Sequence, residues 1–155
     1  MDAAQNLKIV AFDPGITTGY ASGVITDGKL GAVSGQAKWK ELDLYLQLKF
    51  AQPRIIIYER FDFRRGQSRM ELFPRNLIGV IHLYYQKRMA QGVPIDLFPQ
   101  MPVEGKNYYT DAVLKSSKMY KVGNPHANDA MRHLLHWYTF GPGFKYNTNG
   151  FEPLA

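Results

Sequence analysis

Two runs of consecutive apolar residues, each ending in an acid, constrain the fold of this chain most strongly. The first, LKIVAFD, spans residues 7–13 and ends in Asp13, and the second, RIIIYE, spans residues 54–59 and ends in Glu59. A mostly continuous apolar run of this length, broken in the first segment only by Lys8, is typical of a strand that is covered on both faces. We therefore expect two neighbouring strands in one sheet, with the two acids at the same end.

The patterns between and after these runs predict an α/β domain. Asp27-Gly28 is a hairpin signal, so the first three strands should form an antiparallel meander. Apolar residues at helical spacing predict a helix ending before Pro53 and a long helix that begins near Ser68 or near Pro74 and ends near residue 91. A short strand and two further helices follow. This order predicts a five-stranded mixed sheet, three antiparallel strands and then two parallel ones, with helices on both faces.

The bulk composition limits the class of protein. The 155 residues suffice for one domain, 1–140, and residues 141–155 read as a C-terminal tail rich in Gly and Asn. The chain has no cysteine, which excludes disulfides and thiolate nucleophiles. Neither a membrane span nor a signal peptide is recognisable, so we expect a cytoplasmic protein without a membrane partner. The net charge of +6 indicates a polyanionic partner, nucleic acid before membrane, although a basic protein without such a partner is the plain alternative.

The last predicted helix adds two more polar side chains to the acid pair. His126 and Asp129 lie three residues apart in its first turn and project from one face. If this helix packs beside the two strands, Asp13, Glu59, His126 and Asp129 converge. Three carboxylates in one place repel one another unless a cation is bound, and oxygen-rich ligand sets favour Mg²⁺ or Mn²⁺. Two such ions activate water and stabilise the leaving oxygen of a phosphodiester, which is the chemistry of a nuclease.

Each of these residues also has a purely structural interpretation. Asp13 suits a turn, Glu59 suits a surface ion pair, and His126 and Asp129 suit an exposed helix start. Taken singly, these interpretations are favoured. Taken together they are weaker, because two strand ends and one helix turn would have to carry these side chains by coincidence.

Two further histidines lie on the same predicted helix. His133 follows Asp129 by four residues and can approach the site, whereas His136 lies three residues further along. We interpret both as packing residues.

Three motifs in order, FDPGITTGY, IIIYERF and NPHANDAMRHLLHW, resemble the RuvC family of Holliday-junction resolvases, within the ribonuclease-H-like superfamily. The compact, cysteine-free chain is similar to the resolvases carried by bacteriophages, which would act in the host cytoplasm. The resemblance spans about residues 8–140. It implies a ribonuclease-H-like fold in which Asp13, Glu59, His126 and Asp129 are both metal ligands and catalytic residues.

The resemblance also implies an activity. Such a protein is a homodimeric, Mg²⁺- or Mn²⁺-dependent crossover junction endodeoxyribonuclease, a phosphodiester hydrolase of DNA recombination and repair. It nicks two strands of a four-way junction symmetrically. Two-fold symmetry of the protein would match that of the DNA.

Basic and aromatic side chains are candidates for contacts with the DNA. The segment RFDFRRGQSR directly follows Glu59, where arginines would neutralise phosphates and a phenylalanine would wedge against unstacked bases. Later lysines would extend the basic surface, and a solvated basic loop is the alternative. The candidates are Phe63, Arg64, Arg65, Arg69, Lys106, Lys115 and Lys118.

Other assignments stay open at this point. The predicted helix at 74–91 is apolar on more than one face, which suits packing on a second subunit, but burial within one subunit is the alternative. Two other functions also fit: a related nuclease acting on RNA or flap DNA, and a non-catalytic junction-binding protein.

Overall fold

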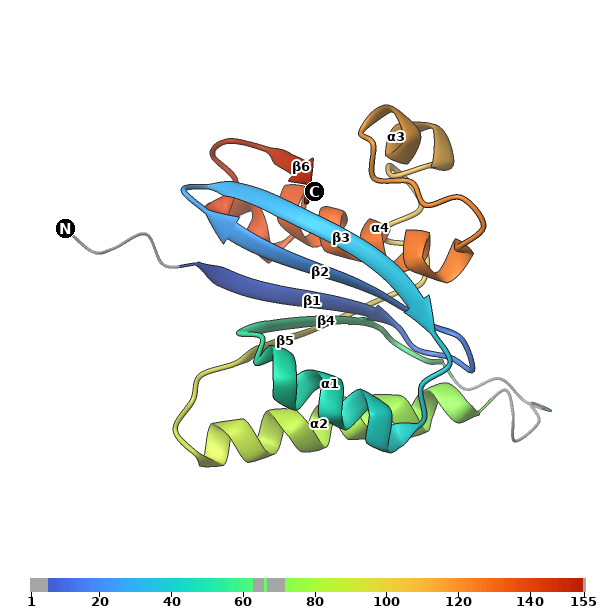
Figure 1. Ribbon diagram of the computed structural model, residues 1–155, viewed down its shortest axis with the longest axis vertical. Helices are drawn as coiled ribbons and strands as arrows, with labels where there is room; N and C mark the ends of the chain where they lie inside the picture. The colour runs from blue at the N-terminus through green and yellow to red at the C-terminus, as the bar shows by residue number, and fades with distance from the viewer. Residues whose placement is uncertain (1–5, 63–65, 67–71, 155) are drawn as a thin grey trace.

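The computed structural model describes residues 6–62, 66 and 72–154, and its central element is a mixed sheet between helices on both faces (Figure 1). The six strands run in the order β5-β4-β1-β2-β3-β6. The first three are antiparallel neighbours, β4 and β5 run parallel to β1, and β6 runs parallel to β3. The strands are β1 Leu7–Asp13, β2 Thr18–Thr26, β3 Lys29–Ala37, β4 Ile55–Glu59, β5 Asp96–Gln100 and β6 Phe151–Pro153.

The sheet has one strand more than the five that the sequence predicts. The meander of three strands and the two parallel strands are present, and the extra strand comes from the segment assigned to a tail. There Pro142–Tyr146 forms a short 3₁₀ helix, η1, and β6 pairs with residues 30–32 of β3. A strand of three residues is too short to show an alternating pattern, and its pairing with β3 is fixed by contacts distant in the sequence.

Four α-helices are present in the described residues, with one pair and one single helix on opposite faces of the sheet. α1 and α2 lie side by side on one face, and α4 crosses the other (Figure 1). None of the helices described has the length and apolarity needed to cross a lipid bilayer. The helices are α1 Glu41–Ala51, α2 Phe73–Ala90, α3 Asp111–Ser116 and α4 Pro125–Thr139.

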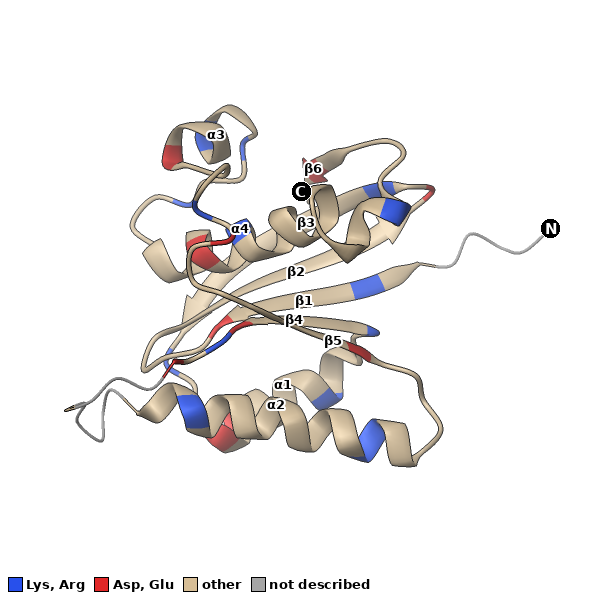
Figure 2. Ribbon diagram, turned by 180° about the vertical axis from the view of Figure 1, so that it is seen from behind, with Lys and Arg blue, Asp and Glu red and all other residues tan. Residues whose placement is uncertain are grey.

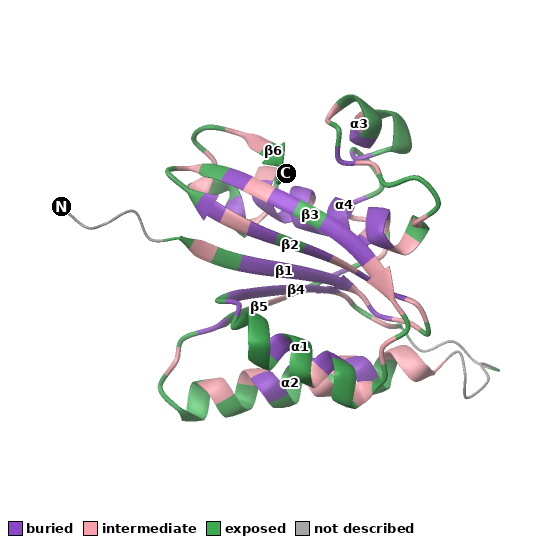
Figure 3. Ribbon diagram, viewed as in Figure 1, coloured by how far each residue is buried: buried purple, intermediate pink, exposed green. Residues whose placement is uncertain are grey.

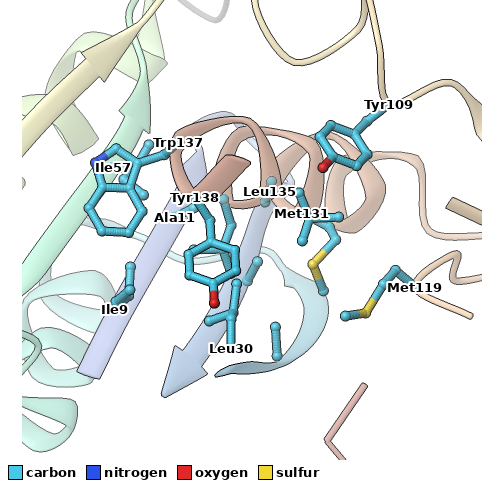
Figure 4. Packing of buried hydrophobic residues seen from close by; sticks show 14 of the residues in the cluster. Ile9, Ala11, Leu30, Ile57, Tyr109, Met119, Met131, Leu135, Trp137 and Tyr138 are labelled. Carbon is cyan, nitrogen blue, oxygen red and sulfur yellow. The ribbon is translucent and has the colours of Figure 1, made fainter. Parts of the chain in front are cut away.

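The apolar runs of β1 and β4 are explained by two separate hydrophobic cores. Ile9 and Ala11 of β1 belong to the core beneath α4 (Figure 4), whereas Val10 and Phe12 belong to the core beneath α1 and α2. Successive side chains of a strand point to opposite faces, so a strand between two cores must be apolar throughout. The same alternation holds in β4, and both strands are buried in Figure 3. The prediction of doubly covered strands is confirmed.

The predicted turn signals also have their expected roles. Asp27 and Gly28 connect β2 to β3 with φ angles of 51° and 74°, as a two-residue hairpin turn with two left-handed residues requires. Gln52, with a φ of 50°, ends α1 just before Pro53. These local signals set the hairpin and the end of α1.

Candidate active site

The register of β1 and β4 brings the two strand-terminal acids to the same edge of the sheet. Phe12 lies opposite Tyr58 in this parallel pair, so Asp13 and Glu59 occupy the next step of the two strands. Acidic segments mark the adjacent ends of β1 and β4 in Figure 2. The side chains are largely buried, with 16% of Asp13 and 17% of Glu59 exposed. The placement predicted from the two apolar runs is therefore present.

The first turn of α4 lies directly over this end of the sheet because a glycine leaves room for it. Gly19 is the partner of Asp13 in the β1–β2 pair, and a Cβ atom on it would lie 1.8 Å from the carbonyl oxygen of His126. The backbone N–H of His126 donates to Oε1 of Gln36 on β3 at 3.2 Å. The close approach and this hydrogen bond fix the start of α4 against β2 and β3.

All four predicted site residues line one open cavity. Its volume is about 420 Å³, and its walls include Asp13, Glu59, His126 and Asp129. The turn after β1, residues 14–17, and the first residues of α2 complete the lining. Side chains that are up to 116 positions apart in the chain thus meet at one hollow of the surface.

The carboxylates perturb one another within this cavity. Burial, followed by interactions with Glu59 and Asp129, raises the pKa of Asp13 to about 9. Burial also raises the pKa of Glu59, but hydrogen bonds with His133 and Asp13 outweigh it and the pKa is lowered. At neutral pH Asp13 therefore holds a proton, and Glu59 carries the negative charge of the pair.

Each of the three acids is paired with a side-chain nitrogen of α4. In this arrangement, no group of three or more His, Asp or Glu side chains in the described residues could hold a metal ion. The pairs, with their nitrogen–oxygen distances, are His126 with Asp13 at 3.2 Å, His133 with Glu59 at 3.1 Å and Arg132 with Asp129 at 2.7 Å.

The oxygen atoms of these three carboxylates nevertheless suit a hard divalent cation. Carboxylate oxygens are the ligands that Mg²⁺ and Mn²⁺ prefer. Burial, together with repulsion from Glu59 and Asp129, keeps a proton on Asp13, and a bound cation would relieve this repulsion. Closing the set around an ion requires Asp13 to give up this proton. Binding of a cation would therefore change the charge of the Asp13–Glu59 pair most directly.

The remaining predicted residues fall in three groups. Lys106 lies near the site, with Nζ 3.9 Å from Oδ2 of Asp129, and its charge opposes the rise in the pKa of Asp13. Lys115 lies over the ring of Tyr120 at 4.7 Å, and Lys118 lines a different cavity beside β3. The other candidates lie outside the described residues; they are Phe63, Arg64, Arg65 and Arg69.

Three further residues belong to the site environment. From the sequence we placed His133 near the site but interpreted it as a packing residue, and we did not identify Gln100 or Arg132. His133 is buried, but its contact with Glu59 goes beyond the packing role we expected, whereas His136 packs against Phe140. Gln100 ends β5 as Asp13 and Glu59 end their strands, and this shared position was an available signal. Arg132 follows Asp129 by three residues, a spacing that places both on one helix face.

Comparison with solved structures identifies the fold. The chain resembles T. thermophilus RuvC in complex with a Holliday junction substrate, with 16% identity and a TM-score of 0.60, over 86% of this chain and 95% of that chain. A second structure, of Thermus thermophilus RuvC, gives 16% identity and a TM-score of 0.56 over the same shares of the two chains. No protein-family model and no curated protein matches the sequence. The expected resemblance to RuvC is thus confirmed for the fold.

Proposed function

We propose that this chain is a metal-dependent endonuclease that resolves four-way DNA junctions by paired phosphodiester nicks. The observation that carries the proposal is the single open cavity lined by Asp13, Glu59, His126 and Asp129. Further support comes from the fold, because one structure that shares it is RuvC bound to a Holliday junction substrate.

The acids of the cavity have the role of metal ligands in this proposal. Asp13, Glu59 and Asp129 would hold Mg²⁺ or Mn²⁺. The bound metal would supply an activated water and stabilise the leaving oxygen of the phosphodiester. The low exposure of the three carboxylates keeps bulk water from weakening their interactions with bound charge.

His126 has a different position from the acids. Its side chain is 45% exposed, more than that of any of the three carboxylates, and its Nδ1 faces Oδ2 of Asp13. Nε2 is then the ring atom available to a metal or to the attacking water. We assign His126 to one of these two roles, ligand or orienting group.

The basic surface would hold the DNA over this cavity. The chain carries a net charge of +6, and Lys106 lies beside Asp129 at the rim of the acidic site. A lysine at this place can contact a phosphate next to the scissile bond. The arginines that follow β4 in the sequence belong to the same proposal.

A homodimer is part of the proposal because a four-way junction must be nicked at two symmetric places. Its support is a set of exposed apolar side chains on the two helices that cover the face opposite α4. Leu83 and Met89 of α2 are 51% and 46% exposed, and Leu42, Leu46 and Phe50 of α1 are 67%, 50% and 90% exposed. Exposed segments of both helices are green in Figure 3. Such surface is costly in water and is suited to a second copy.

A cleavage assay tests the activity. Labelled four-way junction is incubated with wild type and with Glu59→Gln, with and without Mg²⁺. We expect paired nicks only from wild type with Mg²⁺, and a loss of at least about 100-fold in Glu59→Gln.

The substrates of the assay separate the other functions. Flap DNA and RNA–DNA hybrids, run in parallel, reveal a related nuclease if they are cut in preference to the junction. Binding of the junction without any Mg²⁺-dependent product indicates a non-catalytic binding protein. Equal product from wild type and Glu59→Gln would contradict the proposed site.

A further inference from the structure

Behind Glu59 lies a pair of buried polar side chains that the proposed chemistry does not use directly. His133 of α4 is 1% exposed and Gln100 of β5 is 5% exposed. Gln100 is the register partner of Glu59 in the parallel β4–β5 pair. A row of polar strand ends therefore crosses the sheet from Asp13 through Glu59 to Gln100.

Hydrogen bonds fix the orientation of both side chains. Nε2 of Gln100 donates to the backbone carbonyl of His133 at 3.1 Å, which turns Oε1 of Gln100 toward the imidazole. Nδ1 of His133 lies 2.7 Å from this Oε1, so Nδ1 carries the hydrogen and donates to it. The other ring nitrogen, Nε2, is then directed at Oε2 of Glu59 at 3.1 Å.

The cost of this arrangement indicates that it serves more than packing. Burying an imidazole and an amide is unfavourable unless both are hydrogen-bonded, and apolar side chains of similar size would fill the same space without this cost. Both neighbouring cores are made of such apolar side chains. The polar pair occurs where the core meets Glu59.

We propose that His133, oriented by Gln100, is a positioning residue for Glu59 and prepares the site for a divalent cation. The imidazole lies against one oxygen of the Glu59 carboxylate from the core side, so the carboxylate is held in one orientation at the cavity. This inference rests on the proposed metal-dependent function. A partner behind a metal ligand characteristically changes metal affinity by about 10- to 100-fold when it is removed.

The test measures binding of Mn²⁺ alone, without DNA, by calorimetry or by the loss of the free-ion signal in electron paramagnetic resonance. His133→Leu removes the hydrogen bond but keeps an apolar side chain in the core. We expect its Mn²⁺ affinity to be lower than that of wild type by at least about 10-fold. His133→Gln keeps an N–H group near the position of Nε2 and should recover most of this loss.

Two further variants separate positioning from packing. Gln100→Leu leaves the imidazole in place without its orienting partner and should weaken Mn²⁺ binding less than His133→Leu does. His136→Leu, one turn away on α4, is the matched control and should bind Mn²⁺ as wild type does. In the cleavage assay, the Mn²⁺ concentration for half-maximal rate should rise in the same order as the dissociation constants.

The outcomes distinguish this inference from the proposed function. If wild type binds Mn²⁺, Glu59→Gln does not, and a folded His133→Leu binds as wild type does, the positioning role is overturned while the metal site stands. If His133→Leu does not fold, Mn²⁺ binding at the wild-type affinity in a folded Gln100→Leu overturns it equally. If wild type itself binds no Mn²⁺, the metal-dependent function fails and the inference fails with it.

Discussion

α4 and α2 cover opposite faces of the same sheet, but they are buried to very different extents. Ten of the 15 residues of α4 are buried, whereas three of the 18 residues of α2 are buried. α4 also carries the polar side chains that contact all three acids of the site, and α2 contributes only its first turn to the cavity.

This difference indicates that the two helices have different roles. Few positions of α4 are exposed, because one side of the helix packs on the sheet and other sides carry the residues that contact the site. Few substitutions in α4 should therefore leave both the stability and the site unchanged. α2 keeps the apolar side chains of Leu83 and Met89 on its outer side, where the described residues do not cover them. We therefore expect changes along α4 to affect stability and the site together, and changes along α2 to affect mainly association.

The largest difference in stability between changes near the two helices should come from replacing one glycine by alanine beside α4 and one within α2. In Gly19→Ala the new Cβ would meet the backbone of His126, which cannot rotate away, and we expect a loss of at least ~4 kcal/mol in the free energy of unfolding. Urea unfolding measures this loss.

Gly79→Ala on α2 is the matched control for Gly19→Ala. Its Cβ would meet no atom within 4 Å, and alanine is the better helix former, so we expect a gain of about 0.5–1 kcal/mol. Equal effects of the two substitutions would remove the contrast between the helices.

A smaller loss should follow from Arg132→Met on α4. The Arg132 guanidinium contacts Asp129 and Asp111 and donates through Nε to the carbonyl of Tyr109, with 9% of its side chain exposed. Removing it leaves the buried carbonyl of Tyr109 and the largely buried carboxylate of Asp129 without this partner, and we expect a loss of about 3 kcal/mol by urea unfolding. Arg88→Met on α2 loses an exposed hydrogen bond to Gln91 and should cost less than about 1 kcal/mol.

A gain in stability should come from Asp13→Asn in the absence of divalent cations. Because the pKa of Asp13 is raised from 3.8 to about 9, its contribution to stability is present below pH 4 and is lost as the pH rises through 9. Asparagine does not titrate, so the variant should exceed wild type by about 2 kcal/mol at pH 8 and by much less at pH 4.

Thermal unfolding in a chelator at both pH values measures this difference. Glu41→Gln on α1, which keeps an acceptor for Asn76 of α2, is the control and should follow wild type at both pH values. A pH-independent difference between Asp13→Asn and wild type would contradict the account of three carboxylates in conflict.

A substitution on the outer side of α2 should change the stability of the monomer least and its association with a second copy most. Leu83→Glu on α2 places a charge on the exposed apolar surface and should change the free energy of unfolding of the monomer by less than about 0.5 kcal/mol. Sedimentation should nevertheless show loss of the proposed dimer. Gln86→Glu, on the same helix at an exposed polar position, should leave the dimer intact.

Sequence patterns were enough to predict the parts of the structure that depend on local chemistry or on strands covered on both faces. The runs ending in Asp13 and Glu59 predicted both strands and their common end, because burial on two faces leaves no polar position until the strand ends. The hairpin at Asp27-Gly28 followed from the need for positive φ angles.

What could not be predicted depends on contacts between distant segments. β6 is held by pairing with β3 and by Tyr138, whose hydroxyl donates to the carbonyl oxygens of Gly28 and Gly150. No pattern within three residues encodes this pairing. The link from Gln100 to His133 also joins two elements that lie 33 positions apart.

An anomalous difference map from crystals grown with Mn²⁺ tests most directly whether the ends of β1 and β4 and the first turn of α4 form one cation site. We expect an anomalous peak between the carboxylates of Asp13, Glu59 and Asp129 in wild type, and none there in Asp13→Asn. Well-ordered wild-type crystals at saturating Mn²⁺ with no peak at this cavity, or with a peak only elsewhere, would contradict this expectation.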